Sequence, residues 1–135
     1  MASKKLGYPE APPNEARPCV LVVEDELLIR MLLSEGLRDE GFQVIEACNA
    51  DEALMILDTG QTDIIISDVR MPGALDGLGL LRLVRQRFAA LPVIVTSGHL
   101  EPREALNEGA SRFVTKPYTV EDVIYEVRQV LGTAK

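Results

Sequence analysis

Three short, uninterrupted apolar runs constrain the fold of this 135-residue chain more than any other feature of its sequence. They occupy residues 19–23, 64–66 and 93–95. Apolar side chains at every position, rather than at every second one, are typical of parallel strands that helices cover on both faces. Longer segments with helical periodicity separate the runs. The sequence therefore predicts successive βαβ units that build one parallel sheet.

Two further strands are expected at residues 42–46 and 112–115, where polar side chains interrupt the apolar pattern. Edge strands tolerate such residues more easily than doubly covered strands, so the second and fifth strands should lie at the edges. With right-handed crossovers, the prediction is an α/β fold: a doubly wound five-stranded parallel sheet with strand order 2-1-3-4-5.

Helices are expected between the strands because apolar residues recur there at a helical period. Asn49 and Thr119 are the predicted N-caps of the second and fifth helices. The fourth helix, residues 102–108, offers only Ala105 and Leu106 and should be short and weakly packed. The other apolar stripes are Ile29, Leu32, Leu33 and Leu37; Ala53, Ile56 and Leu57; Leu80, Leu83, Val84 and Phe88; and Val120, Val123, Ile124, Val127 and Leu131.

The chain is expected to form one domain over residues 19–132. Residues 1–18 contain four prolines and no hydrophobic period, which predicts a flexible tail, and residues 133–135 leave no room for an output domain. The net charge of −7 argues against nucleic-acid binding. No apolar run approaches the roughly 20 residues of a membrane span, and no secretory signal is seen, so a cytoplasmic location is expected.

Acidic residues follow two of the predicted central strands: Glu24 and Asp25 after the first, and Asp68 after the third. The carboxyl ends of parallel strands meet at one edge, where ligands bind. Three crowded carboxylates repel one another unless a cation neutralises them. Oxygen ligands of this kind suit Mg²⁺, with Mn²⁺ as a substitute, and Mg²⁺ commonly shares its remaining positions with phosphate oxygens.

Hydroxyl and ammonium groups follow the remaining strands: Thr96 and Ser97 after the fourth, and Lys116 after the fifth. Such groups stabilise the oxygens of a transferring phosphoryl group, and Asp68 between them is the natural nucleophile. Taken singly, each residue also has a structural explanation. The acidic pair resembles a helix N-cap, Asp68 a turn residue and Lys116 a solvated charge. Their joint occurrence at four strand ends favours a phosphoryl-transfer site.

The motifs VVEDE, ISDVRMP, IVTSG and TKPY, in this order and spacing, resemble the receiver domain of bacterial two-component response regulators. The resemblance covers residues 19–132 and implies the flavodoxin-like receiver fold. It implies a signalling domain, not an enzyme beyond self-catalysed phosphotransfer and autodephosphorylation. Asp68 would accept a phosphoryl group from a sensor histidine kinase or a histidine phosphotransfer protein. A stand-alone receiver with an unknown protein effector is expected.

The resemblance also implies roles for individual residues. Glu24, Asp25, Asp68 and the main-chain carbonyl of Arg70 would hold Mg²⁺. The phosphoryl pocket would be formed by Thr96, Lys116, Ser97 and Arg70, with a cis peptide bond between Lys116 and Pro117. The switch would couple Thr96 to Phe113, although Phe113 is equally well explained as a core residue. It would change the surface of the fourth helix, fifth strand and fifth helix, where a homodimer or another protein would bind.

Some features depart from the resemblance or favour other classes. The loop holding Gly73, Ala74 and Leu75 is one residue longer than the common family pattern. A haloacid dehalogenase type phosphatase also uses an aspartate nucleophile with Mg²⁺, but it needs a second Asp where Arg70 stands. A flavodoxin-like flavin carrier would need a phosphate loop where Glu24 and its acidic neighbours lie. His99, the only histidine, is expected to be a loop residue rather than a metal ligand.

Overall fold

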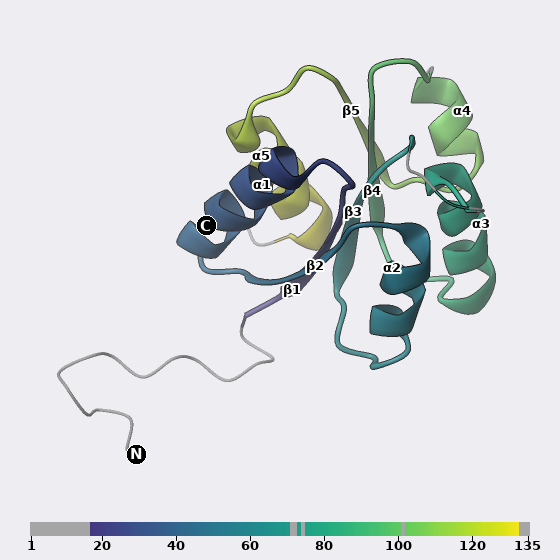
Figure 1. Cartoon of the computed structure of the whole chain (residues 1–135), viewed down its shortest axis with the longest axis horizontal. Helices are drawn as coiled ribbons and strands as arrows, with labels where there is room; N and C mark the ends of the chain where they lie inside the picture. Colours follow the sequence, from purple (N-terminus) through teal and green to yellow (C-terminus); the bar gives the residue numbers. More distant parts are fainter. Residues whose placement is uncertain (1–16, 71–72, 74, 101, 133–135) are drawn as a thin grey trace, which may run out of the picture.

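The computed structural model describes residues 17–70, 73, 75–100 and 102–132. Within them, five strands alternate with five helices (Figure 1). The strands are β1 (Cys19–Val23), β2 (Gln43–Ala47), β3 (Ile64–Asp68), β4 (Val93–Ser97) and β5 (Arg112–Thr115). The helices are α1 (Leu27–Asp39), α2 (Ala50–Leu57), α3 (Gly77–Arg87), α4 (Pro102–Asn107) and α5 (Val120–Leu131).

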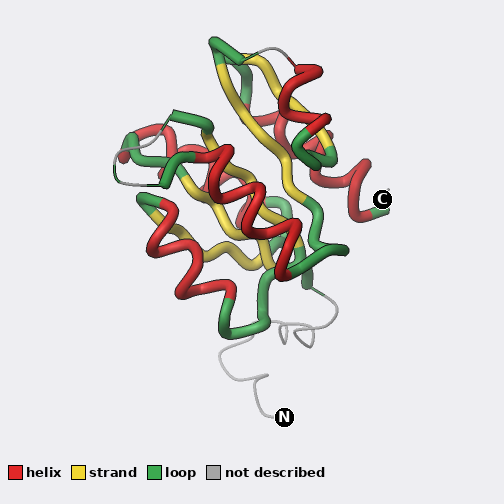
Figure 2. Tube along the Cα trace, turned by 90° about the vertical axis from the view of Figure 1, so that its right-hand side faces the viewer, coloured by secondary structure: helices red, strands yellow, loops and turns green. Residues whose placement is uncertain are grey.

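The strands form one parallel sheet in the order β2-β1-β3-β4-β5, which confirms the predicted topology. Strands β1, β3 and β4 are buried along their whole length, whereas β2 and β5 retain partly exposed residues at the two edges. Helices α1 and α5 cover one face of the sheet, and α2, α3 and α4 cover the other (Figure 1). Figure 2 shows the strands running between these two helical layers.

Two separate cores result, because successive residues of a strand point to opposite faces. Val20, Val22, Ile64, Ile66 and Ile94 face α1 and α5, where they pack with Val123 and Val127 of α5. Leu21, Val23, Ile65, Val93 and Val95 face the other layer, where Leu80 and Val84 of α3 meet them. The apolar runs of the sequence therefore serve both cores at once.

Helix ends follow the expected capping chemistry in part. The side chains of Thr119 and Asp122 form the capping box of α5, and the Asn49 side chain accepts from the Glu52 N–H at the start of α2. Helix α3 begins at Gly77, three residues before its first predicted apolar position, because the Asp76 side chain accepts from the Gly79 N–H. This cap was missed in the sequence.

The apolar stripe of α1 was predicted incorrectly at one position. Leu33 and Leu37 are buried, but Leu32 is 59% exposed. Helix α1 has more apolar side chains than the sheet can cover, so some of them stay exposed. Helix α4 is short as predicted, and only its Ala105 is buried.

The predicted tail falls mostly on residues outside the described part of the chain, as do residues 133–135. Its two described residues lie against β2: the carbonyl oxygens of Arg17 and Pro18 accept hydrogen bonds from Gln43. Among the described helices, none has the length and apolar character needed to cross a bilayer.

Candidate functional site

Strand register brings the predicted site residues to one corner of the sheet. Glu24, Asp68, Thr96 and Lys116 each lie two positions beyond a core residue that faces α1 and α5, namely Val22, Ile66, Ile94 and Val114. Side chains two residues apart on a strand point to the same face of the sheet, so these four side chains lie on the face that α1 and α5 cover. Asp68 and Thr96 are directly paired across β3 and β4. Asp68 is the last residue of β3 and Thr96 is the last but one of β4, whereas the sequence pattern predicted both just beyond their strands.

A cluster of three carboxylates lies at this corner. Glu24, Asp25 and Asp68 each offer an oxygen, and these oxygens all lie within 4.8 Å of one another. Glu24 and Asp68 are buried, at 2% and 6% exposure, whereas Asp25 is open to solvent. Hard oxygen ligands with one open side fit a hydrated divalent cation such as Mg²⁺, which retains several waters. The donor set therefore suits the predicted metal.

Lys116 supplies the positive charge of the cluster. Its Nζ atom lies 3.1 Å from Asp68 Oδ2 and 3.7 Å from Glu24 Oε1. Burial lowers the pKa of Lys116, but the hydrogen bond and charge of Asp68, with the charge of Glu24, outweigh it and raise that pKa above its ordinary value. The ammonium group thus stays charged beside Asp68. The peptide bond between Lys116 and Pro117 is cis.

Glu24 is held in place by the backbone N–H of Glu26 and by the Arg30 side chain. The Glu26 N–H donates to Glu24 Oε2 at 3.0 Å, and Arg30 donates to the Glu24 carbonyl oxygen at 2.8 Å. Arg30 also pairs with Glu46 of β2 at 3.2 Å. Burial raises the pKa of the Glu24 carboxyl to about 7, more than the Glu26 hydrogen bond lowers it. Sequence reasoning did not find Arg30, since its position on α1 carries no motif.

The backbone around Asp68 is also fixed. The Val69 N–H donates to Asp68 Oδ1 at 2.8 Å, which leaves Oδ2 toward Lys116. The Gly77 N–H donates to the Val69 carbonyl. A Cβ atom at Gly77 would lie 2.1 Å from the Asp68 carbonyl oxygen, so only glycine permits this approach of α3 to the site. The signal in the sequence for this approach is the Asp76-Gly77 pair just ahead of the apolar stripe that begins at Leu80.

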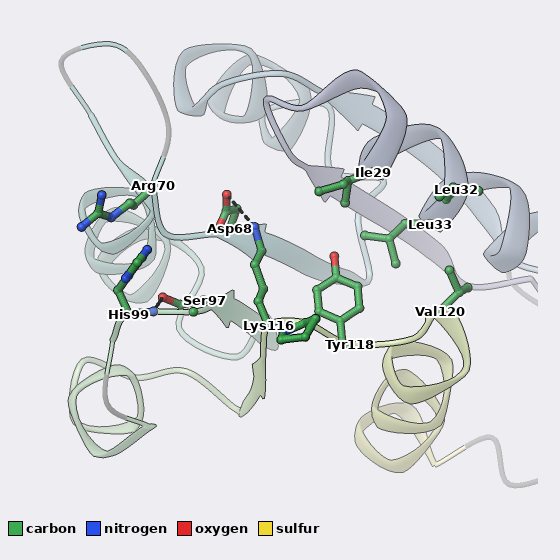
Figure 3. A pocket seen from close by; sticks show the side chains of 12 residues that line it. Ile29, Leu32, Leu33, Asp68, Arg70, Ser97, His99, Lys116, Tyr118 and Val120 are labelled. Carbon is green, nitrogen blue, oxygen red and sulfur yellow. Dashed lines mark hydrogen bonds and ion pairs between the residues drawn. The ribbon is translucent and has the colours of Figure 1, made fainter.

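Of the other residues singled out in the sequence, Ser97, Arg70 and His99 lie around the cluster and Phe113 does not. Ser97 is buried, and its Oγ atom accepts from the N–H groups of His99 and Leu100. Arg70 and His99 are exposed, and in Figure 3 the Arg70 side chain extends away from Asp68, on the side opposite Lys116. Phe113 is partly buried and packs on the core beneath α2, α3 and α4, on the opposite face of the sheet from Asp68.

A cavity of about 490 Å³ opens beside Asp68 and Lys116 (Figure 3). One end is polar and is formed by Asp68, Arg70, Ser97, His99 and Lys116. The other end lies against α1 and the start of α5 and is lined by Ile29, Leu32, Leu33, Pro117, Tyr118 and Val120. A mostly apolar cavity with a few convergent polar groups is the usual form of a ligand site.

Comparison with known proteins decides the family. The family model described as "Response regulator receiver domain" matches residues 20–128, which is most of the chain. The chain belongs to the receiver-domain family of response regulators. Its receiver fold also matches the crystal structure of the NtrX receiver domain from Brucella abortus, at 34% identity and a TM-score of 0.79 over 85% of this chain and 99% of that one. Chemotaxis protein CheY4 of Vibrio cholerae matches at 29% identity and a TM-score of 0.78, over 84% and 98%.

Curated relatives of this receiver domain are longer proteins. An NtrX-like response regulator of Rickettsia felis is 34% identical over 120 residues, which are 86% of this chain and 25% of that protein. The DNA-binding transcriptional regulator NtrC of Salmonella typhimurium is 33% identical over 119 residues, again 86% and 25%. The chain thus spans about a quarter of the length of these relatives. The expected stand-alone arrangement stays a prediction.

Proposed function

We propose that this receiver domain accepts a phosphoryl group on Asp68 in a Mg²⁺-dependent reaction, with a histidine kinase or a histidine phosphotransfer protein as the donor. The observation that carries the proposal is the Asp68 carboxylate, 3.1 Å from Lys116 Nζ and within 4.8 Å of ligand oxygens of Glu24 and Asp25. A nucleophile, a fixed positive charge and a cation site therefore share one corner.

The groups around Asp68 would each have a separate role in phosphoryl transfer. Val69 holds Oδ1 of Asp68, so Oδ2 is the oxygen that attacks phosphorus. Lys116, which pairs with Oδ2 before transfer, would contact a phosphoryl oxygen afterwards. Glu24, Asp25, Asp68 and the Arg70 carbonyl would hold the cation, which supplies charge stabilisation at the phosphoryl oxygens. The buried Thr96 hydroxyl, one strand away from Asp68, would contact another of these oxygens.

The direct test uses acetyl phosphate as a small phosphoryl donor. With Mg²⁺ present, we expect the intact mass of the protein to increase by one phosphoryl group. Excess chelator should reduce that species at least tenfold, because three carboxylates with a single lysine repel an incoming phosphate dianion. Equal modification with chelator would contradict the cation requirement. An unmodified protein that also fails to respond to beryllofluoride would contradict the proposed acceptor chemistry.

The exposed apolar residues of α1 support a protein donor. Leu27, Leu28, Met31 and Leu32 are 45–74% exposed, and they lie on the helix that borders the cavity beside Asp68. Exposed apolar side chains gathered in one place mark protein interaction sites. A donor that docks on α1 would bring its phosphohistidine to the cavity mouth.

A substitution on α1 separates docking from chemistry. We expect Leu28→Gln to slow phosphoryl transfer from the cognate donor protein about tenfold, the effect of losing one buried apolar contact of about 1.4 kcal/mol. Met55→Gln on α2 is the matched control, because Met55 and Leu28 are both 74% exposed. Both variants should react with acetyl phosphate like the wild type. Equal transfer rates for the two variants would place the donor elsewhere.

The output side of the proposal concerns α4, β5 and α5. Phosphorylation would draw the Thr96 hydroxyl toward the phosphoryl group and let the Phe113 ring move on the other face of the sheet. Helix α4 buries only Ala105, and an element with few buried contacts rearranges at low cost. Leu106 and Tyr125, 48% and 59% exposed, offer apolar contacts for a homodimer or a protein effector.

No observation favours the alternative of a haloacid dehalogenase type phosphatase, since Arg70 occupies the position of the second aspartate that would act as its general acid.

A further inference from the structure

We propose that Tyr118 recognises the imidazole leaving group of the phosphoryl donor, with its hydroxyl oxygen accepting a hydrogen bond from the ring. This inference rests on the proposed function and deepens it, because it assigns a donor-recognition residue to the cavity beside Asp68. Tyr118 is not one of the residues that would hold the cation or the phosphoryl oxygens.

The first observation is an unsatisfied hydroxyl. The Oη atom of Tyr118 is buried, and no residue in the described part of the chain forms a hydrogen bond with it. Buried polar groups without a partner are rare and need an explanation. In Figure 3 this hydroxyl and the Lys116 Nζ atom point in the same direction, away from the segment that joins β5 to α5. The hydroxyl is therefore directed into the site rather than toward bulk solvent.

The second observation is the shape and chemistry of the cavity. Tyr118 lines the same cavity of about 490 Å³ as Asp68 and Lys116, and the walls near it are the apolar side chains of Ile29, Leu33 and Val120. A flat ring with apolar faces and one polar edge matches apolar walls that carry one hydroxyl. An imidazole attached to the transferring phosphoryl group has this character. An acetate leaving group has no N–H to offer Tyr118.

The Tyr118 hydroxyl keeps its proton in this environment. Burial raises the pKa of Tyr118 above its ordinary value, and the charges of Glu24, Asp68 and Glu26 raise it further, so the phenol remains neutral. Its oxygen can then accept a hydrogen bond.

The transfer step then balances without a proton from the protein. The donor ring binds with the phosphoryl group on one nitrogen and a proton on the other, and that N–H donates to Tyr118 Oη. As Asp68 Oδ2 forms its bond to phosphorus, the phosphorus–nitrogen bond breaks and its electron pair stays on the ring nitrogen. Neutral imidazole leaves with the proton that it brought. The hydroxyl of Tyr118 holds the ring throughout and is not consumed.

The test compares two small donors, monophosphoimidazole and acetyl phosphate, by the rate at which the protein gains one phosphoryl group with Mg²⁺ present. Tyr118→Phe keeps the ring and removes only the hydroxyl. We expect the ratio of the monophosphoimidazole rate to the acetyl phosphate rate to fall about tenfold in this variant, the loss of one hydrogen bond to a charged group. Thr62→Val removes a hydroxyl that is likewise buried without a hydrogen-bond partner in the described residues. Thr62 lies ahead of β3, at the end opposite Asp68, so this variant should leave the ratio at its wild-type value.

The other outcomes of this test distinguish a failure of the Tyr118 role from a failure of the proposed function. An unchanged ratio in Tyr118→Phe, whether both rates fall or neither does, would overturn the role of the hydroxyl in donor recognition. A wild-type protein that reacts with acetyl phosphate but not with monophosphoimidazole would also overturn it, while the proposed function would stand. A wild-type protein that reacts with neither donor would overturn the proposed function itself.

Discussion

Asp68→Asn should abolish phosphorylation and leave the fold intact. The amide oxygen can still accept from the Val69 N–H, which donates to Asp68 Oδ1 at 2.8 Å, but an amide does not attack phosphorus. The substitution also removes one of three crowded carboxylates, so its effect on the free energy of unfolding should stay within about 1 kcal/mol. Intact mass after acetyl phosphate with Mg²⁺ measures the first effect, and urea unfolding measures the second.

Asp63→Asn is the matched control for this experiment. Asp63 precedes β3 at the opposite end from Asp68, and its carboxylate likewise accepts a backbone hydrogen bond, from the Cys19 N–H at 2.7 Å. This variant should gain one phosphoryl group as the wild type does. A phosphoryl group retained by Asp68→Asn would move the acceptor to another carboxylate, with Asp25 the first candidate.

A second large effect is expected in the pH dependence of stability. Burial raises the pKa of Glu24 from 4.5 to about 7 in the folded protein. Its contribution to stability is therefore fully present below pH 4.5 and is lost as the pH rises through 7. A difference of about 2.5 between the two pKa values corresponds to about 3 kcal/mol. Metal-free wild-type protein should be less stable at pH 8 than at pH 5 by up to this amount from Glu24 alone.

Glu24→Gln tests that prediction, because a neutral amide can accept from the Glu26 N–H without the charge. Urea unfolding at pH 5 and pH 8 with chelator should show a smaller loss of stability in this variant than in the wild type. At pH 8, Mg²⁺ should increase the free energy of unfolding more in the wild type than in the variant, because the cation binds the ionised carboxylate. Glu35→Gln on the exposed side of α1 removes a charge far from the cluster and should behave like the wild type. Equal pH dependence in Glu24→Gln and the wild type would show that Glu24 is not the group responsible.

Much of the fold could be predicted because local and global signals agree. Doubly covered strands need apolar side chains at every position, and residues 19–23, 64–66 and 93–95 meet that need without a break. The start of α3 could not be placed from periodicity, since Gly77 and Gly79 carry no side chain to mark a face. The exposure of Leu32 was missed for a related reason. Residues 27–33 hold six apolar side chains, and only the packing of α1 on the sheet decides which are covered.

The site residues at the strand ends could be predicted from the sequence, because the carboxyl ends of parallel strands all lie at the same edge of the sheet. Arg30 and Tyr118 lie beyond that rule. Arg30 reaches the Glu24 carbonyl across one turn of helix, and Tyr118 comes into the cavity only through the path of the chain after Lys116. Neither contact has a sequence period, so both depend on the three-dimensional arrangement.

The sheet lies between the donor surface proposed on α1 and the α4 part of the proposed output surface. Helix α1, with its exposed leucines beside the cavity, lies in one helical layer, and α4 lies in the other (Figure 1). A donor on α1 and an effector on α4 would thus occupy different sides of the same molecule. An effector that contacts α4 and not α5 would leave α1 accessible, so that a ternary complex would form and phosphorylation would not require the effector to dissociate. The response would then depend on how long the phosphoryl group persists on Asp68 rather than on competition between the two partners.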